Sequence, residues 1–217
     1  MHFEVLVEDR SGSIALEIVL QKILGENGTD HTWRMHAYKG IGRIPGDLRR
    51  TQDPARRLLL DQLPRLLRGY GRSLQHQAAC VVVVVDLDDR DCTTFKRDLL
   101  GAMAACNPGP RTLFRIAVEE SEAWLLGDRE AVMTAYPQAR KPVLDGYVQD
   151  SICGTWELLA DAVHAGGSAR LKKAGWPTPG RAKCDWAAMI APHMDVERNL
   201  SASFRVFRDG VRHLAAG

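Results

Sequence analysis

Acidic side chains follow three apolar segments of the sequence. Asp86 and Asp88 come after "ACVVVVV", Glu8 follows "FEVLV", and Glu120 and Glu122 follow "RTLFRIAV". Carboxylate oxygens are the ligands that Mg²⁺ prefers, and Mg²⁺ usually binds one or two carboxylates together with water and substrate phosphate. The residue types and their spacing therefore indicate a metal site suited to phosphate chemistry.

These acids can meet only if the apolar segments are neighbouring strands of one sheet. Five consecutive valines are typical of a strand that is buried on both faces, as in the centre of a parallel sheet. Strands are expected at residues 3–8, 31–38, 79–86 and 111–119. Helical patterns follow each of them, which predicts an α/β fold with a mostly parallel four-stranded sheet flanked by helices. Because ligands bind beyond the carboxyl ends of such strands, all three groups of acids should lie at one edge of the sheet.

The helices have recognisable ends. We expect Ser11 or Ser13 to cap the first one and Gly25 to end it, and a later helix to open at Pro54 and bend at Pro64. After about residue 142 the chain changes character, with helical patterns at 154–167, 183–194 and 201–217 and a basic Gly/Pro-rich loop, "RLKKAGWPTPGRAK", before the second of them. We therefore expect an α/β core at 1–142 and a helical extension at 143–217.

Composition narrows the class of protein. The 217 residues are 45% hydrophobic and 26% charged, with a formal net charge of +2. No apolar run is long enough to span a membrane, and the first residues lack the features of a signal peptide. The five cysteines are scattered and form no CxxC pair, which favours reduced thiols and disfavours a zinc site. A cytoplasmic location is the resulting expectation.

The acids after the valine strand allow two interpretations. If strand geometry persists, Asp86 and Asp88 point to the same side and can bind one cation. Alternatively, acids after strands serve as turn formers and helix caps: Asp91 would cap the helix that begins at Cys92, and residues 119–122 would favour a helix N-terminus.

The ordered set of motifs resembles the Toprim domain of topoisomerases, primases, recombination-repair proteins and the overcoming-lysogenization-defect nucleases. The matching stretches are "LVEDRSG", "VVVDLDD" and "AVEESEAWLLGD", which contain Glu8, Asp86 with Asp88, and Glu120 with Glu122. The chain is more closely similar to a family of small stand-alone bacterial Toprim-like proteins of unknown function. That family also shares a tail like "NLSASFRVF".

The resemblance implies metal-dependent phosphodiester chemistry, most simply cleavage of DNA, with one or two Mg²⁺ or Mn²⁺ ions. Asp86 and Asp88 would bind metal, and Glu8 would bind metal or act as general acid or base. Glu120 and Glu122 would complete the first metal site or hold a second. A lysine near the phosphate is expected by the same resemblance, with Lys183 as the first choice. The rivals are Lys172 and Lys173.

One position departs from the resemblance. A second acid often stands four residues after the first glutamate in this branch of nucleases, and Gly12 occupies that position here, with Asp9 close by. This departure keeps open a non-catalytic metal-binding or nucleic-acid-binding regulatory subunit. A response-regulator-like domain is a third interpretation, but the segment "ESEAW" has no place in it.

Basic residues suggest a polyanionic partner. Eight arginines and three aspartates lie between residues 43 and 72, and the loop "ARLKKAGWPTPGRAK" is also basic. The expected nucleic-acid-binding residues are Arg43, Arg49, Arg50, Lys172, Lys173 and Arg181. Related Toprim nucleases are often paired with an ATPase, and this chain has no ATPase motif, so a partner ATPase is expected alongside DNA. A homo-oligomer remains an alternative, and no membrane partner is expected.

Other chemistries find little support. The sequence contains no Gly-x-Ser-x-Gly elbow and no P-loop motif. Ser201 and Ser203 are better explained as caps of the last helix than as nucleophiles. Trp124, Trp156 and Trp186 lie in helical patterns and are expected in the core.

Overall fold

Four parallel strands form one sheet in the computed structural model of the protein, which describes residues 1–48 and 53–217. The strands are β1 (His2–Val7), β2 (Thr32–Ala37), β3 (Ala79–Asp86) and β4 (Thr112–Ala117). Their order across the sheet is β2-β1-β3-β4, which places the valine strand in the interior. Every residue of β3 is buried, as the run of β-branched residues predicts.

Helices cover both faces of this sheet. Successive strand residues point to opposite faces, so Val82 joins an apolar cluster with α1 (Arg10–Leu24) and α10 (Ala202–Ala215), whereas Val83 joins one with α2 (Leu59–Ser73) and α3 (Cys92–Ala104). The predicted α/β class with a parallel four-stranded sheet flanked by helices is thereby confirmed.

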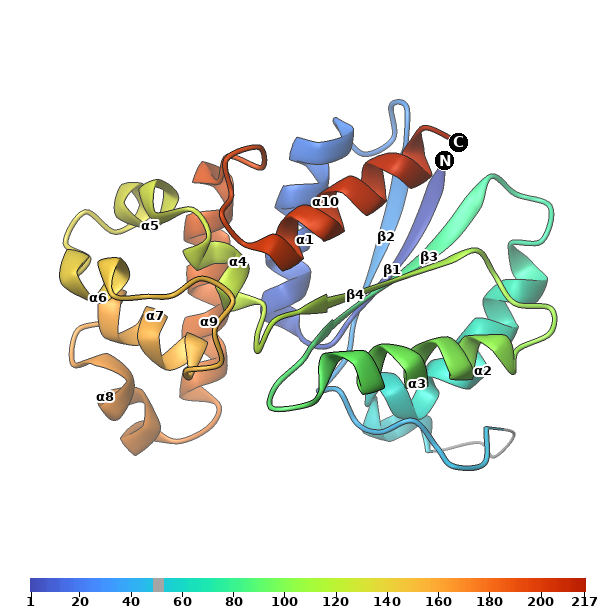
Figure 1. The fold of residues 1–217 in the computed structure, drawn as a ribbon, viewed down its shortest axis with the longest axis horizontal. Coiled ribbons are helices and arrows are strands. Elements are labelled where there is room, and N and C mark those ends of the chain that lie inside the picture. The colour runs from blue at the N-terminus through green and yellow to red at the C-terminus, as the bar shows by residue number, and fades with distance from the viewer. Residues whose placement is uncertain (49–52) are drawn as a thin grey trace.

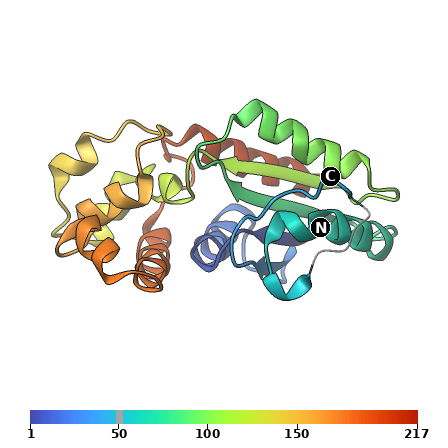
Figure 2. The same ribbon diagram turned by 90° about the horizontal axis from the view of Figure 1, so that it is seen from below.

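A second group of helices lies beyond the carboxyl ends of the strands, opposite the end where both chain termini lie (Figures 1 and 2). This group is α4 (Glu122–Leu126), α5 (Arg129–Ala135), α6 (Lys141–Asp145), α7 (Thr155–Val163), α8 (Gly167–Ala174) and α9 (Thr178–Ile190). Two short 3-10 helices, η1 (Pro54–Arg56) and η2 (Ala191–His193), complete the described elements. The helical group therefore faces the edge at which the acids are expected.

Some expected helix boundaries are wrong. Asp9, rather than Ser11 or Ser13, caps α1, because its Oδ1 accepts a 2.7 Å hydrogen bond from the amide of Gly12. Gly25 ends that helix as expected, with φ of 87°. Pro54 opens η1 instead of α2.

The basic segment expected as a loop is largely helical. Lys172 and Lys173 belong to α8, and α9 already begins at Thr178, so that residues 175–177 alone connect the two helices. Pro179 lies in the first turn of α9, where proline is tolerated because its missing N–H has no partner there. The glycines and prolines of this segment therefore mark helix ends.

The return of α10 to the sheet joins the two parts of the chain. Phe204 and Phe207 of α10 belong to the same apolar cluster as Val84 of β3 and Trp186 of α9. Arg115 of β4 also donates from Nε to the carbonyl of Val206 over 2.9 Å. The division at residue 142 remains a prediction, and one apolar cluster extends across it.

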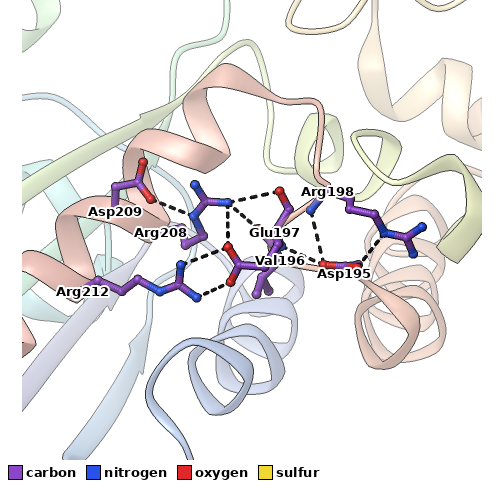
Figure 3. A network of polar contacts seen from close by, with 7 residues as sticks. All are labelled: Asp195, Val196, Glu197, Arg198, Arg208, Asp209 and Arg212. Carbon is purple, nitrogen blue, oxygen red and sulfur yellow. Dashed lines mark hydrogen bonds and ion pairs between the residues drawn. The ribbon is translucent and has the colours of Figure 1, made fainter.

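Hydrogen bonds and ion pairs of charged side chains connect residues 195–198, which precede α10, to one another and to α10 (Figure 3). Arg208 donates to the carbonyl of Val196 over 2.8 Å, and Arg212 forms an ion pair with Glu197. Ser201 then caps α10 by accepting from the amide of Phe204 over 3.1 Å, which confirms its expected role as a cap. These contacts hold the segment that leads from η2 to α10 against α10.

No helix among residues 1–48 and 53–217 is long and apolar enough to cross a membrane. All five cysteines are free thiols, as their spacing predicts.

Candidate functional site

The topology of the sheet singles out one place along its carboxyl edge. The chain runs from β1 outward to β2 and from β3 outward to β4, so the strand order reverses between β1 and β3. In open α/β sheets, ligands bind in the crevice outside the strand ends at such a switch point. Glu8 directly follows β1 and Asp86 is the last residue of β3.

Glu8 and Asp86 lie against each other at this point. The Asp86 amide donates to Glu8 Oε2 over 3.4 Å, and Asp86 is buried. Burial, followed by the negative charge of Asp88, raises the pKa of Glu8 to about 7. Burial and the adjacent Glu8 also raise the pKa of Asp86 well above its usual range. Two carboxyl groups are thus held together in a position that disfavours their charged forms.

Asp88 is oriented differently from the strand-based expectation. The strand ends at Asp86, and Asp88 adopts a left-handed backbone conformation with φ of 51°. Its amide donates to the carbonyl of Glu119 over 2.8 Å, and its carboxylate forms a 2.5 Å ion pair with Arg90. The condition that strand geometry persists is therefore not met, although the charge of Asp88 still acts on Glu8.

Glu119 anchors the helical group to the sheet. It also has a left-handed backbone, with φ of 60°, and such strain in a residue other than glycine is concentrated at functional sites. Its carboxylate accepts hydrogen bonds from the amides of Cys153, Gly154 and Thr155 at the start of α7. Burial alone would raise the pKa of Glu119, but these bonds and one from the Thr155 hydroxyl lower it.

Lys183 links the remaining acids. Its Nζ lies 3.1 Å from Glu122 Oε2 and 3.6 Å from Glu120 Oε1, and only 10% of its side chain is exposed. Glu120 Oε2 accepts from the amide of Trp156 over 3.0 Å. The rivals Lys172 and Lys173 are exposed, and Lys172 pairs with Glu157. The structure thus brings Lys183, among the three candidate lysines, into the acidic cluster.

The charges in this cluster are unbalanced. Burial raises the pKa of Glu120 to about 7 and also raises the pKa of Glu122, although Lys183 opposes both shifts. Burial would lower the pKa of Lys183, but the carboxylates, Glu122 foremost, outweigh it and raise that pKa. Asp86 is among these carboxylates, which places it in the same electrostatic group. The carboxyl groups of Glu120, Glu122 and Asp86 therefore share one buried ammonium group.

Asp9 belongs to the same group, although it is not among the predicted site residues. Its charge acts on Asp86, Glu122 and Lys183, although its oxygens accept from Ser11 and Gly12 at the start of α1. The N-cap pattern after β1 is the signal that could have identified it.

Gly12 has a packing reason to lack a side chain. A Cβ at this position would lie 2.9 Å from Val7 Cγ2 and 3.2 Å from Asp9 Oδ1. A larger side chain at this point would therefore press on β1 and on the cap of α1.

The expected nucleic-acid-binding residues lie on two sides of the site. Arg43 is exposed and lines a groove with Arg90, Asp89, Asp91 and Asp98. Lys172, Lys173 and Arg181 are exposed on α8 and α9. Arg49 and Arg50 lie outside the described residues.

A metal ion would have to rearrange this cluster. Among the residues that the structure describes, no group of three or more His, Cys, Asp or Glu side chains stands ready to hold a metal ion. The geometry gives the reason, because Lys183 lies between Glu120 and Glu122 while Arg90 engages Asp88. The donor set nevertheless consists of carboxylate oxygens, which are the ligands that Mg²⁺ requires.

Comparison with known proteins identifies a family without an assigned activity. Residues 7–214 match the model of the family described as "Domain of unknown function (DUF4276)", which covers nearly the whole chain, and the chain belongs to this family. No curated protein matches the sequence, and no solved structure matches it.

Proposed function

We propose that this member of the DUF4276 family hydrolyses phosphodiester bonds of nucleic acid with the help of Mg²⁺ or Mn²⁺. The observation that carries the proposal is that Glu8, Asp86, Glu120 and Glu122 form one electrostatic group with Lys183 at the carboxyl edge of the sheet. The resemblance to Toprim nucleases agrees with the proposal, because the matching motifs contain the same acids.

The charge imbalance explains why a cation suits this site. Buried carboxylates repel one another and resist ionisation, as the raised pKa values of Glu8 and Glu120 indicate. A hard divalent cation relieves both effects, and Glu8, Asp86, Glu120 and Glu122 would hold it. Asp88 is a further ligand in the proposal, since exchange of Arg90 for a cation would free its carboxylate.

Hydrolysis requires that water adds to phosphorus, that the bond to the leaving oxygen breaks, and that one proton moves from the water to that oxygen. A bound Mg²⁺ would supply Lewis acidity toward the phosphate. Glu8 would take one of two roles, that of a ligand of the cation or that of the acceptor of the proton from water. Lys183 would contribute positive charge beside the phosphate.

The resemblance also guides the biological setting of the proposal. We place the protein in the cytoplasm, as the nuclease half of a two-protein phage-defence or repair system whose other half is an ATPase. The free thiols agree with a reducing compartment.

Incubation with supercoiled plasmid tests the proposal. The wild type should nick the plasmid with Mg²⁺ or Mn²⁺ and not with EDTA. Asp86→Asn should lower the rate by more than about a hundredfold, the upper limit for residues that only orient metal ligands. Asp185→Asn, which changes an exposed acid on the helix that carries Lys183, is the matched control and should cleave like the wild type. Equal nicking by wild type and Asp86→Asn would contradict the proposal, as would no nicking when the partner ATPase is present.

A second candidate function is a non-catalytic binding subunit. It is favoured by the glycine at position 12 and by the lysine that already neutralises part of the cluster. Titration with Mn²⁺ in a calorimeter separates the two functions. Binding without cleavage would favour the subunit, and no binding of any divalent ion would contradict the metal site in both.

A further inference from the structure

The connection between α8 and α9 presents an exposed tryptophan. The side chain of Trp176 is 76% exposed, which is unusual for a residue that proteins normally bury. Its ring rests on Gly180, where an added Cβ would lie 2.8 Å from Cζ3 of the indole. The absence of a side chain at Gly180 thus allows the ring to lie close against α9 while much of its surface remains open.

This tryptophan stands close to the acidic cluster. Gly180 precedes Lys183 by three residues on α9, and residues at this spacing are neighbours on a helix surface. Lys183 contacts Glu120 and Glu122. The exposed indole is therefore about one helical turn from the side chain that enters the cluster.

A second aromatic residue borders the cluster from α7. The amide of Trp156 donates to Glu120, and Lys172 Nζ lies 5.7 Å from the centre of the Trp156 ring. Lys172 is 57% exposed, and Lys173 and Arg181 are exposed as well. Helices α7 and α9 thus contact the acids directly, and α7, α8 and α9 carry the half-buried Trp156 and the exposed basic groups.

We propose that this surface, formed by Trp156, Lys172, Lys173, Trp176 and Arg181, binds a single strand of nucleic acid and stacks an unpaired base on Trp176. Aromatic faces bind bases only when these are unstacked from their neighbours, whereas basic side chains bind the backbone in any form. The inference rests on the proposed function in one respect, namely that the strand runs from this surface toward the acids. It adds that the substrate is single-stranded or locally melted.

Binding measurements with EDTA present test the inference without cleavage. The probes are fluorescein-labelled oligothymidylate and oligouridylate of about 12 nucleotides, close to the site size of one small binding domain, and a duplex of equal length. The full-length wild type should bind at least one of the two single strands more tightly than the duplex, and comparison of the two distinguishes DNA from RNA. Trp176→Ala should weaken single-strand binding about tenfold or more, and Trp176→Phe should retain part of the affinity. Met189→Ala, which changes an exposed apolar residue of α9, is the control and should leave binding unchanged.

Three outcomes would overturn the inference. They are equal affinity for single strand and duplex, an unchanged affinity of Trp176→Ala, and a self-association that Trp176→Ala abolishes without an effect on oligonucleotide binding. Each is distinguishable from failure of the proposed function. Selective single-strand binding that depends on Trp176, in a protein that cleaves nothing with Mg²⁺ or Mn²⁺, would contradict the nuclease alone.

Discussion

Lys183 is the residue on which the candidate site depends. It is a buried cation among carboxylates that are themselves buried, and removal of one partner from such a group leaves uncompensated charge in a medium that solvates it poorly. The ion pair between Lys183 and Glu122 therefore adds little to the free energy of unfolding, but removal of one of its two partners is costly. Lys172, whose ion pair with Glu157 is exposed, offers a comparison within the same protein.

Lys183→Met should destabilise the metal-free protein by about 3–5 kcal/mol, because it leaves buried carboxylates without a cation. Urea unfolding in EDTA measures the change. The control Lys172→Met should cost about 1 kcal/mol or less, as is usual for surface ion pairs. The double variant Lys183→Met with Glu122→Gln should regain part of the loss, because it removes both partners. Equal costs for Lys183→Met and Lys172→Met would refute this role of Lys183.

The raised pKa values of Glu8 and Glu120 predict how the free energy of unfolding depends on pH. Their pKa values rise from 4.5 to about 7 on folding, so between these values the folded protein holds protons that the unfolded chain has released. Stability should therefore be highest below about pH 4.5 as far as these groups are concerned, and should fall as pH rises to about 7. The slope is at most about 1.4 kcal/mol per pH unit for each carboxyl group.

Urea unfolding of the metal-free protein at several pH values between 4.5 and 8 checks this dependence. Glu8→Gln should flatten the profile, because the variant has no carboxyl group to titrate at that position. Glu130→Gln, which changes an exposed acid outside the cluster, serves as the control and should keep the wild-type profile. A profile for Glu8→Gln that parallels the wild type would show that Glu8 does not titrate in this range.

At the scale of elements, the strands and helix caps that depend on local sequence could be predicted, whereas features that depend on contacts between distant segments could not. The valine strand and the Asp91 cap of α3 follow from local patterns, and the structure confirms them. The left-handed backbone of Asp88 and the helix that Glu119 anchors depend on contacts between distant segments. The acids could be assigned to one edge because they all follow strands of a parallel sheet. The contacts of each acid could not be predicted, because they come from distant segments.

The basic segment shows a second limit of local patterns. "RLKKAGWPTPGRAK" contains helix breakers throughout, yet most of it is helical, because glycine and proline are also the residues that begin and end helices. The resemblance predicts Lys183, the last residue of this segment, as the lysine of the site. Its actual position is set by α9, which packs against α1 and α4, and no local pattern encodes that packing.

Gly12 allows a test at the level of a helix. Gly12→Ala should destabilise the protein by about 1–3 kcal/mol, because the new methyl group would press on Val7 and Asp9 where α1 meets β1. Gly101→Ala in α3 is the control, since nothing lies within 4 Å of its added methyl group. It should instead stabilise the protein by about 0.5–1 kcal/mol through helix propensity. Thermal unfolding of both variants measures the difference. A stabilising Gly12→Ala would show that α1 can shift away from the sheet.

At the scale of the whole molecule, α10 packs against both the sheet and the helical group and so connects them. The chain leaves the sheet after β4, builds α4 to α9 beyond the strand ends, and returns to cover the sheet with α10 (Figure 1). Trp124 stacks on Phe207 with ring centres 5.0 Å apart, and Trp124 Nε1 donates to Ser203 over 2.9 Å. Helix α4, which carries Glu122, is therefore packed directly on α10.

This arrangement predicts a single cooperative unfolding transition. Because one apolar cluster includes residues on both sides of position 142, tryptophan fluorescence and far-ultraviolet circular dichroism should give the same midpoint in urea. Phe207→Ala should shift the urea midpoints of both probes by the same amount. It should lower the free energy of unfolding by about 3–5 kcal/mol, as expected for a large side chain lost from a core. Val206→Ala, one residue away and 57% exposed, should change stability by less than about 0.5 kcal/mol. Two separate transitions, or a Phe207→Ala variant in which only one probe shifts, would instead support independent domains at 1–142 and 143–217. The acidic cluster would then lie at a domain boundary, whereas a single transition means that folding of the whole chain assembles it.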